Sequence, residues 1–413
     1  MTVLPDSWML YTPHDIAGLA KDALVIGPFG SNLKTSDYRD EGVPLIFVKD
    51  IREENFSCPR VYVSNAKAAE LEAHQVLPGD ILITKMGDPP GDVALYDSDV
   101  PGLITADCIR LRPTAGFDRK YLVHSLRTPN ARRQIDAITT GAAQKKVSLD
   151  RFRTRLHISA PPLSEQKRIA AVLDQVDALR TKRREAIDLL DDLAQAIFLE
   201  MFGNPVANER EWPVHAFGEV CETRLGKMLD ASRQTGMNAR PYLRNANVQW
   251  FHVDTTDLLE MDFSEADRIT YGLAPGDVLI CEGGEPGRAA VWRGEVFDCY
   301  FQKALHRARP RQGSANPEYI VWLLRMFSIL DGLSDHISTA TIAHLTGAKL
   351  KNLPIPNPPL PMQEEFAWQI RQVEAAKQRH SIHLTVLDEL FVSLQQRAFS
   401  GTLWDHDREA VAA

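Results

Sequence analysis

Amide and basic side chains gather in a few polar, loop-like segments of this chain. They lie in 31–39, at Lys85 and in 141–155 of the first half, and in 224–234, 244–250, 282–288, 301–307 and 339–351 of the second. Asn, Gln, Arg and Lys match the hydrogen-bonding patterns of DNA base edges, whereas Lys, Ser, Thr and backbone amides hold phosphates. The candidate DNA-binding residues are Asn32, Lys34, Lys85, Gln144, Lys145, Lys146, Lys227, Arg233, Arg244, Asn245, Asn247, Gln249, Arg288, Gln302, Lys303, His306, Arg307, Thr341 and His344. Any single one could equally be solvated loop surface, so only the clusters support the interpretation.

The fragment DPPG, from Asp88 to Gly91, is similar to the Asp/Asn-Pro-Pro-aromatic motif with which amino-methyltransferases hold a flipped base. Here the stacking aromatic is replaced by Gly91, and no glycine-rich loop for a methyl donor precedes the fragment. Pro followed by Gly favours a tight turn instead. The chain also lacks GxxxxGK[ST], HExxH and GxSxG, which are the usual motifs of phosphate-binding loops, zinc-dependent hydrolysis and serine esterases. We therefore expect no enzyme.

Metal and disulfide chemistry are not indicated either. His380 and His383 have a helical spacing that could share a metal, but only Glu389 lies near enough to join them, so we expect no metal site. The five cysteines are widely spaced without a CxxC pair. They are expected to be reduced core residues.

Composition indicates an ordinary globular protein. The chain has 413 residues, 44% of them hydrophobic and 25% charged, with a net charge of −8. An acidic total argues against a surface made entirely for nucleic acid, so any nucleic-acid site must be local. The sequence begins without the charged and apolar regions of a signal peptide, and no apolar run reaches the ~18–20 residues of a membrane span. We expect a cytoplasmic protein without membrane contact.

The chain contains one long unit twice. The segment LPGDILITKMGDPPG, which contains Pro78, returns as APGDVLICEGGEPGR, which contains Pro275, and the shift is 275 − 78 = 197 residues. The same shift relates Arg110 to Arg307. Solenoid repeats recur every 20–50 residues or so, whereas this unit is long enough for a domain and a long helix. Two similar domains in one chain suggest a molecule that binds two similar but non-identical targets.

Each half is expected to hold a small α+β domain, a Pro-rich hinge and a helix. Short β-branched runs bounded by Gly and Pro predict strands, and they lie at 43–51, 79–84, 241–248 and 276–280. We predict a first domain over 1–160, a first long helix over 161–203, a second domain over 204–357, and a second long helix with the C-terminal tail over 358–413. Trp8 and Trp212 do not follow the shift, since 212 − 8 = 204. An insertion is therefore expected near the start of one domain.

Apolar residues alternate in steps of four and three along both predicted helices. The seam positions are Ile169, Leu173, Val176, Ile187, Leu190 and Ile197 in the first helix, and Phe366, Ile370, Val373, Leu384, Leu387 and Leu394 in the second. Polar residues interrupt both seams at the same place, at Arg180 and Arg183 and again at Lys377 and His380. This pattern predicts an antiparallel coiled coil in which the polar residues set the register. The alternative is that each helix packs only on its own domain.

The chain resembles the specificity subunit of type I restriction-modification systems over nearly its whole length. The resemblance rests on GPFGSNLKTSDY (27–38), GVPLIFVKDI (42–51), PGDILIT (78–84), PPLSEQKRIAAVLDQVDAL (161–179), GKMLDAS, RPYLRNANVQW, GDVLICEGGEPGR and FQKALHRARP. The hinge PPLSEQ leading into a helix is its most specific element. The second hinge departs from it, with Pro361-Met362 where the first has Ser164-Glu165.

This resemblance implies a non-catalytic subunit with two target-recognition domains. Each domain would bind one half of a split, asymmetric sequence in double-stranded DNA, and the helices would set the gap. Two methylation subunits carrying S-adenosylmethionine, and restriction subunits using ATP, would be the partners; this chain itself would need no cofactor. Two alternatives remain open, a self-contained DNA methyltransferase or nuclease, and a coiled-coil scaffold that binds only proteins.

Overall fold

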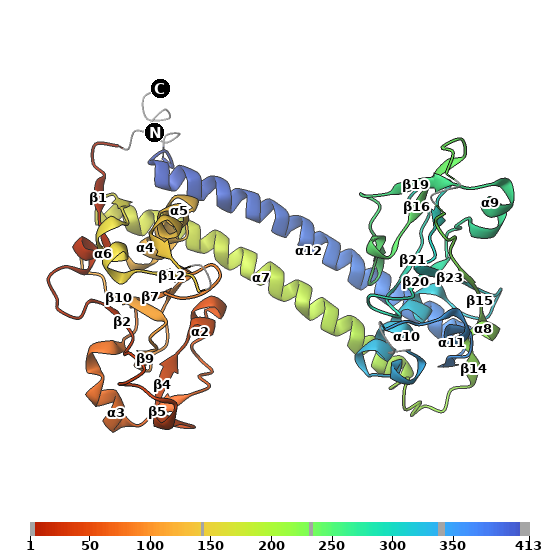
Figure 1. The fold of residues 1–413 in the computed structure, drawn as a ribbon, viewed down its shortest axis with the longest axis horizontal. Helices are drawn as coiled ribbons and strands as arrows, with labels where there is room; N and C mark the ends of the chain where they lie inside the picture. The colour runs from red at the N-terminus through yellow and green to blue at the C-terminus, as the bar shows by residue number, and fades with distance from the viewer. Residues whose placement is uncertain (1–4, 142–143, 231–233, 338–342, 405–413) are drawn as a thin grey trace. The chain divides into compact units, whose positions relative to one another are not determined.

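The computed structural model describes residues 5–141, 144–230, 234–337 and 343–404. Contacts within the chain divide it into unit 1, residues 1–184 and 382–413, and unit 2, residues 185–381. Two long helices, α7 (Leu163–Phe202) and α12 (Leu360–Ser400), contribute to both units. Figure 1 shows the elements of each unit around its share of these helices.

Unit 1 is a mixed α+β domain. Its helices are α1 (Pro13–Ala17), α2 (Val48–Glu53), α3 (Asn65–Glu70), α4 (Arg119–Leu126), α5 (Pro129–Ile138) and α6 (Leu149–Arg155). Its strands are β1 (Met9–Tyr11), β2 (Leu24–Ile26), β3 (Tyr38–Arg39), β4 (Val43–Ile46), β5 (Tyr62–Val63), β6 (Gln75–Val76), β7 (Ile81–Thr84), β8 (Val93–Leu95), β9 (Gly102–Ile104), β10 (Cys108–Leu111), β11 (Thr139–Thr140), β12 (Lys146–Val147) and β13 (Ile158–Ala160).

Unit 2 has the same class of fold. Its strands are β14 (Val214–Ala216), β15 (Cys221–Leu225), β16 (Ala239–Leu243), β17 (Val248–Gln249), β18 (His252–Val253), β19 (Leu259–Asp262), β20 (Val278–Cys281), β21 (Ala289–Val291), β22 (Tyr300–Phe301), β23 (Leu305–Pro310) and β24 (Pro354–Pro356). Its helices are α8 (Phe217–Val220), α9 (Glu265–Tyr271), α10 (Pro317–Ile329) and α11 (Gly347–Lys351), and η4 (Asn245–Asn247) is a short 3₁₀ turn.

The two units repeat one sheet topology. A four-stranded sheet runs in the order β2-β10-β7-β8 in unit 1 and β15-β23-β20-β21 in unit 2, with antiparallel neighbours throughout. A second sheet contains one parallel pair in each copy, β4 with β9 and β16 with β22. The duplication inferred from sequence is thus a duplication of fold.

A set of polar residues, the frame, recurs in both units; all but Arg112 and Arg309 are buried. It consists of Asp80, Arg110, Arg112, Tyr121 and Gln166 in unit 1 and of Asp277, Arg307, Arg309, Tyr319 and Gln363 in unit 2. Asp80 accepts two hydrogen bonds from Arg112, both of 2.7 Å, and Asp277 accepts two from Arg309, of 2.6 and 2.7 Å. Such bidentate pairs fix both geometry and orientation.

Beside each of these pairs lies a buried arginine. Arg110 is 1% exposed and Arg307 4% exposed, and their guanidinium groups donate to backbone carbonyls of Gln75 and Asp22 and of Gly272, respectively. Burial lowers the pKa of Arg110 to about 10 and also lowers the pKa of Arg307, yet both remain protonated at neutral pH. A buried cation of this kind needs its nearby carboxylate.

The hinge glutamine anchors each long helix to its domain. Gln166 donates to Pro161 O at 2.8 Å and accepts from the Asp118 amide, at the N-terminus of α4, at 2.9 Å. Gln363 repeats both bonds, with Pro358 O at 2.7 Å and the Asn316 amide of α10 at 2.8 Å. The proline-rich hinge thus fixes where each helix leaves its domain.

The long helices pack antiparallel in both units. In unit 1, Arg180 near the middle of α7 bonds to Asp388 of α12 at 2.5 Å and lies 4.4 Å from the Phe391 ring. In unit 2, Phe198 near the end of α7 packs edge-on against Phe366 near the start of α12, with ring centroids 5.5 Å apart. The predicted seam residues are buried or partly buried along both helices, which confirms the helix pair over packing on separate domains alone.

The polar interruption of the seam is an ion-pair cluster. Arg180 bridges Asp177 and Asp388 in unit 1, and Lys377 bridges Glu374 and Asp191 in unit 2. Each acidic partner follows the 197-residue shift, so the two clusters are copies of one arrangement.

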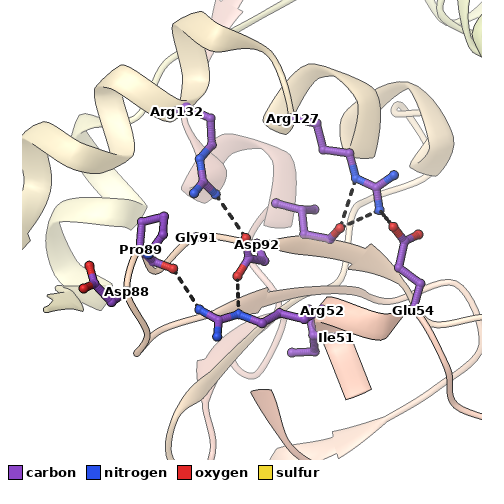
Figure 2. Close-up of a pocket in the computed structure, with 10 residues that line it drawn as sticks. Ile51, Arg52, Glu54, Asp88, Pro89, Gly91, Asp92, Arg127 and Arg132 are labelled. Carbon is purple, nitrogen blue, oxygen red and sulfur yellow. Dashed lines mark hydrogen bonds and ion pairs between the residues drawn. The ribbon is translucent and has the colours of Figure 1, made fainter. Parts of the chain in front are cut away.

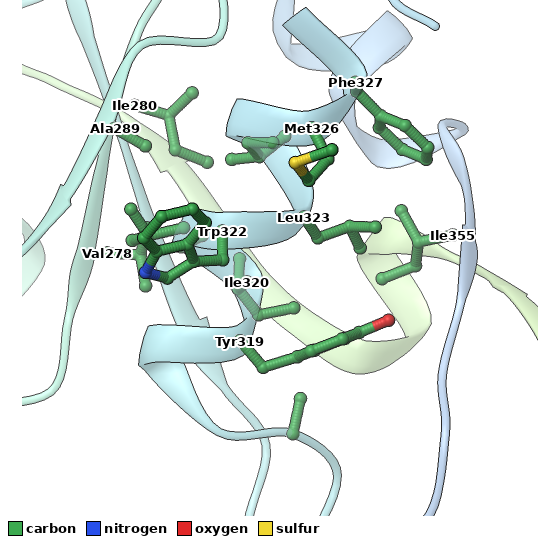
Figure 3. Packing of buried hydrophobic residues seen from close by; sticks show 14 of the residues in the cluster. Val278, Ile280, Ala289, Tyr319, Ile320, Trp322, Leu323, Met326, Phe327 and Ile355 are labelled. Carbon is green, nitrogen blue, oxygen red and sulfur yellow. The ribbon is translucent and has the colours of Figure 1, made fainter. Parts of the chain in front are cut away.

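The core of unit 2 shows how the helix and the sheet meet (Figure 3). Helix α10 presents Trp322 and Met326 to the sheet residues Val278, Ile280 and Ala289, all of them buried. The Tyr319 hydroxyl reaches across to donate to Pro356 O at 2.7 Å, and Tyr121 donates to Ser159 O at the same distance in unit 1. Burial of aromatic and aliphatic side chains of this size is the main source of domain stability.

Two of the predicted strands end early. The run 43–51 is strand only to Ile46, because Asp50 accepts the Phe47 amide at 2.7 Å and starts α2. The run 241–248 ends at Leu243 for the same reason, since Asn247 accepts the Arg244 amide at 2.8 Å. A polar acceptor three residues after a strand end replaces the next strand residues by a helical turn.

Two further expectations are settled by the fold. The insertion near one domain start lies in unit 1, where residues 12–23 separate β1 from β2, whereas only 217–220 separate β14 from β15. The prediction that all cysteines are core residues is wrong for Cys58, which is exposed. The other four are buried and free, and burial raises the pKa of each thiol to about 11 or 12.

Candidate nucleic-acid interface

In unit 1 four of the candidate residues meet at the C-terminal end of β7, an inner strand of the four-stranded sheet. The backbone of Lys85, at the end of β7, accepts the Val147 amide at 2.8 Å, and Lys146 forms a β-bridge with Met86. Lys145 bonds to Asp88 at 3.0 Å. Gln144, Lys145 and Lys146 are exposed. We call Lys85, Asp88, Gln144, Lys145 and Lys146 the first edge.

Unit 2 builds an equivalent edge from different residues. His344 forms a β-bridge with Gly283, and the Leu345 amide donates to Glu282 O at 2.8 Å. A side-chain Cβ at Gly283 would lie 2.9 Å from the His344 ring, so a larger residue there would require the ring to shift. We call Asn245, Glu282, Glu285, Arg288 and His344 the second edge.

Asn245 and Arg288 lie together on the second edge. Asn245 donates to Gly283 O at 2.5 Å, and Arg288 donates to Asn245 O at 3.2 Å and pairs with Glu285 at 3.2 Å. Asn245 Oδ1 and Arg288 Nε are buried without a hydrogen-bond partner among the described residues. Unfilled polar atoms of this kind are expected where a ligand completes the hydrogen bonding.

Other candidates support the domain from inside. Asn247 is 3% exposed and its amide donates to Asp254 O and Asp257 O, both at 3.0 Å. His306 is 1% exposed, burial lowers its pKa, and its neutral ring donates to Leu345 O at 2.9 Å. With Arg307 of the frame, these residues have no surface for a base edge, and we assign them a structural role instead.

Several further candidates are held by acidic or backbone partners. Lys227 bonds to Asp262 O at 2.6 Å and to Asp267 at 2.7 Å. Arg244 pairs with Asp257 at 2.7 Å, and Gln249 donates to Ala246 O at 2.9 Å. Their donors are partly used within unit 2, so they contribute less to a free basic surface than the sequence indicates.

Some candidates lie apart from both edges. Asn32 and Lys34 are exposed before the short turn 35–37, and no hydrogen bond of the described residues joins them to the first edge. Gln302 pairs with Lys227 through a β-bridge, and Lys303 is exposed. Arg233 and Thr341 lie outside the described residues.

A loop beside β16 is held by a single carboxylate. Asp262 accepts hydrogen bonds from the amides of Thr235, Gly236 and Asn238, at 2.5, 2.9 and 2.9 Å, and from the Thr235 hydroxyl. The Thr235 hydroxyl and amide bonds lower the pKa of Asp262 to about 2. Asp262 therefore stays ionised at neutral pH and positions the segment that follows the GKMLDAS sequence.

Neither a membrane span nor a metal cluster belongs to this arrangement. None of the helices in the described part of the chain combines the length and apolar composition needed to cross a bilayer. Across the same residues, no three His, Cys, Asp or Glu side chains form a group able to hold a metal ion.

These features define a tandem pair of small α+β domains. Each is joined to a long helix by a proline-rich hinge that the hydrogen bonds of one glutamine fix in place. The family profile of the type I restriction modification DNA specificity domain matches residues 33–189 and again residues 209–382. Because the two matches cover most of the chain, it belongs to this family.

Relatives match the chain over nearly its whole length. It is 23% identical over 428 residues to the type I restriction enzyme EcoKI specificity subunit of Escherichia coli K12, covering 97% of this chain and 90% of that protein. It is also 23% identical over 436 residues to the EcoBI specificity subunit of Escherichia coli, covering 96% and 86%.

Solved structures share the fold. The S subunit of a type I restriction-modification system from M. genitalium has a TM-score of 0.58 at 13% identity, covering 95% of this chain and 96% of that chain. A chain from a structure of complex assembly in a type I R-M system has a TM-score of 0.56 at 20% identity, covering 97% and 100%.

Proposed function

We propose that this chain is the non-catalytic specificity subunit of a type I restriction-modification complex. Its two domains, over 1–160 and 204–357, would each bind one half of a split, asymmetric target in double-stranded DNA. The main observation in support is that the residues of the frame repeat in the two units whereas the residues of the two edges differ. Lys85 is replaced by Glu282, and Asp92, just before β8, is replaced by Arg288, just before β21. Identical scaffolds with reversed edge charges suit two different half-sites.

The half-site assignment can be tested with one exposed residue from each edge. Gln144→Ala is expected to relax specificity only in the half-site of the first domain, and His344→Ala only in the other half. Each lost base contact costs about 1–3 kcal/mol of discrimination. The control Lys67→Gln changes a partly buried lysine of α3, away from both edges, that pairs with the exposed Glu70. Methylome sequencing of cells with the methylation subunit reads the result, and a motif altered equally in both halves contradicts the assignment.

The long helices would set the gap and dock the methylation subunits. Ile382, Val386 and Leu390 follow one another at steps of four on α12 and are 55%, 57% and 43% exposed. They lie outside the seam, so no contact of the helix pair explains their apolar character. An exposed apolar stripe of this kind fits a partner protein.

Changing this stripe should separate assembly from folding. Ile382→Glu with Val386→Glu is expected to abolish copurification with the methylation subunit while the melting temperature stays unchanged. Gln396→Glu adds a similar charge at another exposed position of α12 and serves as the control. Intact copurification of the double variant would place the docking surface elsewhere.

S-adenosylmethionine and ATP would belong to the methylation and restriction subunits, and this chain would hold neither. Two alternatives make different predictions. A self-contained methyltransferase would transfer label from S-adenosylmethionine to DNA without partners, and a protein-only scaffold would show no salt-dependent DNA affinity.

A further inference from the structure

A polar pocket lies beside the first edge, against the loop that carries the DPPG fragment (Figure 2). It has a volume of about 590 Å³ and is lined by Arg52 of α2, Arg127 just after α4 and Arg132 of α5. The carboxylates on its wall are Glu54, Asp88 and Asp92.

Two of the three arginines are neutralised within the pocket. Arg127 pairs with Glu54 at 2.6 Å and donates to Val93 O. Arg52 donates through Nε to Asp92 at 2.8 Å and through Nη2 to Pro89 O at 3.0 Å. Figure 2 shows Arg52 bonded to Asp92 and Pro89, and Arg127 bonded to Glu54.

Arg132 is different. Its Nη1 forms an ion pair with Asp92 Oδ1 at 3.6 Å, which is too long for a hydrogen bond, and its guanidinium donates no hydrogen bond among the described residues. The side chain is 27% exposed, so it is held by the pocket rather than free in solvent. Asp88 does not compensate it, because Asp88 is 83% exposed and bonds to Lys145 of the first edge. The pocket therefore keeps one partly buried cation that forms an ion pair with Asp92 but whose hydrogen-bond donors are unfilled.

The loop geometry holds Arg132 in this place. Gly91 has a φ of +92°, and a Cβ there would lie 2.6 Å from Ile135 of α5 and 3.4 Å from Arg132 Nη1. Only glycine lets α5 approach the loop so closely. The same loop carries Asp88 and its bond to Lys145, so the pocket and the first edge share one wall.

Unit 2 does not repeat this charge pattern. The residue equivalent to Asp92 is Arg288, which pairs with Glu285. Arg52 lies two residues after the capping Asp50. The equivalent residue in unit 2 is Gln249, which lies two residues after Asn247. The fold therefore does not require the arginine pocket, and its presence is a property of the first domain alone.

We propose that the pocket seats a DNA backbone phosphate next to the half-site of the first domain, bound by Arg132 with help from the unfilled Nη1 of Arg52. A guanidinium fork matches the geometry of phosphate oxygens, and a planar, weakly hydrated cation tolerates partial burial. This assignment rests on the proposed function. It makes the first domain the one that contributes more sequence-independent affinity.

The test compares Arg132→Gln with Arg133→Gln in the full-length chain. Arg133 is the next residue of α5 and is exposed outside the pocket. Binding is measured over a series of salt concentrations to a duplex carrying the methylated motif and to a scrambled duplex. Arg132→Gln is expected to weaken both roughly tenfold and to make the slope of log affinity against log salt shallower by about 0.9. Arg133→Gln should match the wild type.

Two additional measurements keep the outcome decisive. Melting temperatures report folding, and Arg132→Lys, which keeps the charge without the fork, is expected to retain the salt slope but lose part of the affinity. If Arg132→Gln binds DNA like Arg133→Gln, or weakens only the specific duplex, the phosphate site is wrong. A wild-type chain without salt-dependent DNA affinity contradicts the proposed function and this site together.

A separate experiment distinguishes a free phosphate compound from a DNA phosphate as the ligand of the pocket. Inorganic phosphate is titrated against the wild type and Arg132→Gln while the melting temperature is recorded. Stabilisation of the wild type alone, combined with equal DNA affinity of both proteins, would assign the pocket to a free phosphate and overturn the DNA assignment. Parallel loss of DNA affinity and of the phosphate effect supports it.

Discussion

Asp277→Ala is expected to lower the free energy of unfolding of unit 2 by about 3–5 kcal/mol. Asp277 is 1% exposed and accepts both hydrogen bonds of the Arg309 fork, together with the Ala274 amide at 2.8 Å. Its charge also acts on Arg307, which is 4% exposed and forms a salt bridge of 3.4 Å with Glu222. Its removal takes both carboxylate hydrogen bonds from Arg309 and leaves the buried Arg307 guanidinium with only the half-exposed Glu222 as its counter-charge. Breaking a buried pair costs more than the pair itself contributes.

The duplication supplies a matched experiment. Asp80→Ala removes the same carboxylate from unit 1, where Arg110 and Arg112 take the places of Arg307 and Arg309. Each substitution should destabilise one unfolding transition of the full chain in urea. Glu70→Gln removes the exposed carboxylate of an ion pair on α3 and should shift neither transition by more than about 0.5 kcal/mol. A change below 1 kcal/mol for Asp277→Ala would mean that water or rearrangement solvates Arg307.

The duplication and the helix seam could be predicted from sequence because both depend on regular spacing. A constant shift and a four-three apolar pattern do not depend on the local environment, so two long paired helices were expected where α7 and α12 lie. The polar interruption at Arg180 and Lys377 was also visible, although its acidic partners Asp388 and Asp191 were not. Partners on another helix depend on the helix rotation, which the spacing alone leaves open.

The candidate site was less predictable because residue type does not report burial. Asn247 and Arg307 carry the side chains of base readers, yet one caps a helical turn and the other is enclosed by carbonyls. Arg132 was missed because it lies in an amphipathic helix rather than a polar loop. The signal that could have found Asn247's role is its equivalence to Asp50, a capping residue in the first copy. Comparing the two copies position by position separates the residues that have the same structural role in both units from the edge residues that differ between them.

The last prediction concerns the gap between the half-sites. Four residues inserted after Ala178 in α7, with four inserted between Glu389 and Leu390 in α12, are expected to lengthen the DNA spacer that the complex selects. Both insertions are needed because Arg180 pairs with Asp388 and packs on Phe391, so lengthening one helix alone would break this register. Four helical residues add about 6 Å, which corresponds to at most about two base pairs at 3.4 Å each.

The rotation of the second half-site around the DNA axis limits how much longer the selected spacer can become. Each added base pair turns the second half-site around the DNA axis by about one tenth of a turn, whereas a four-residue stutter only locally unwinds the helix pair. One added base pair is therefore expected to be favoured over two. The hinge glutamines Gln166 and Gln363 hold both helices to their domains, which leaves no loose segment to absorb the extra length. Methylome sequencing of the double-insertion variant decides the matter, since an active complex that keeps its original spacer would show that the helices do not set the gap.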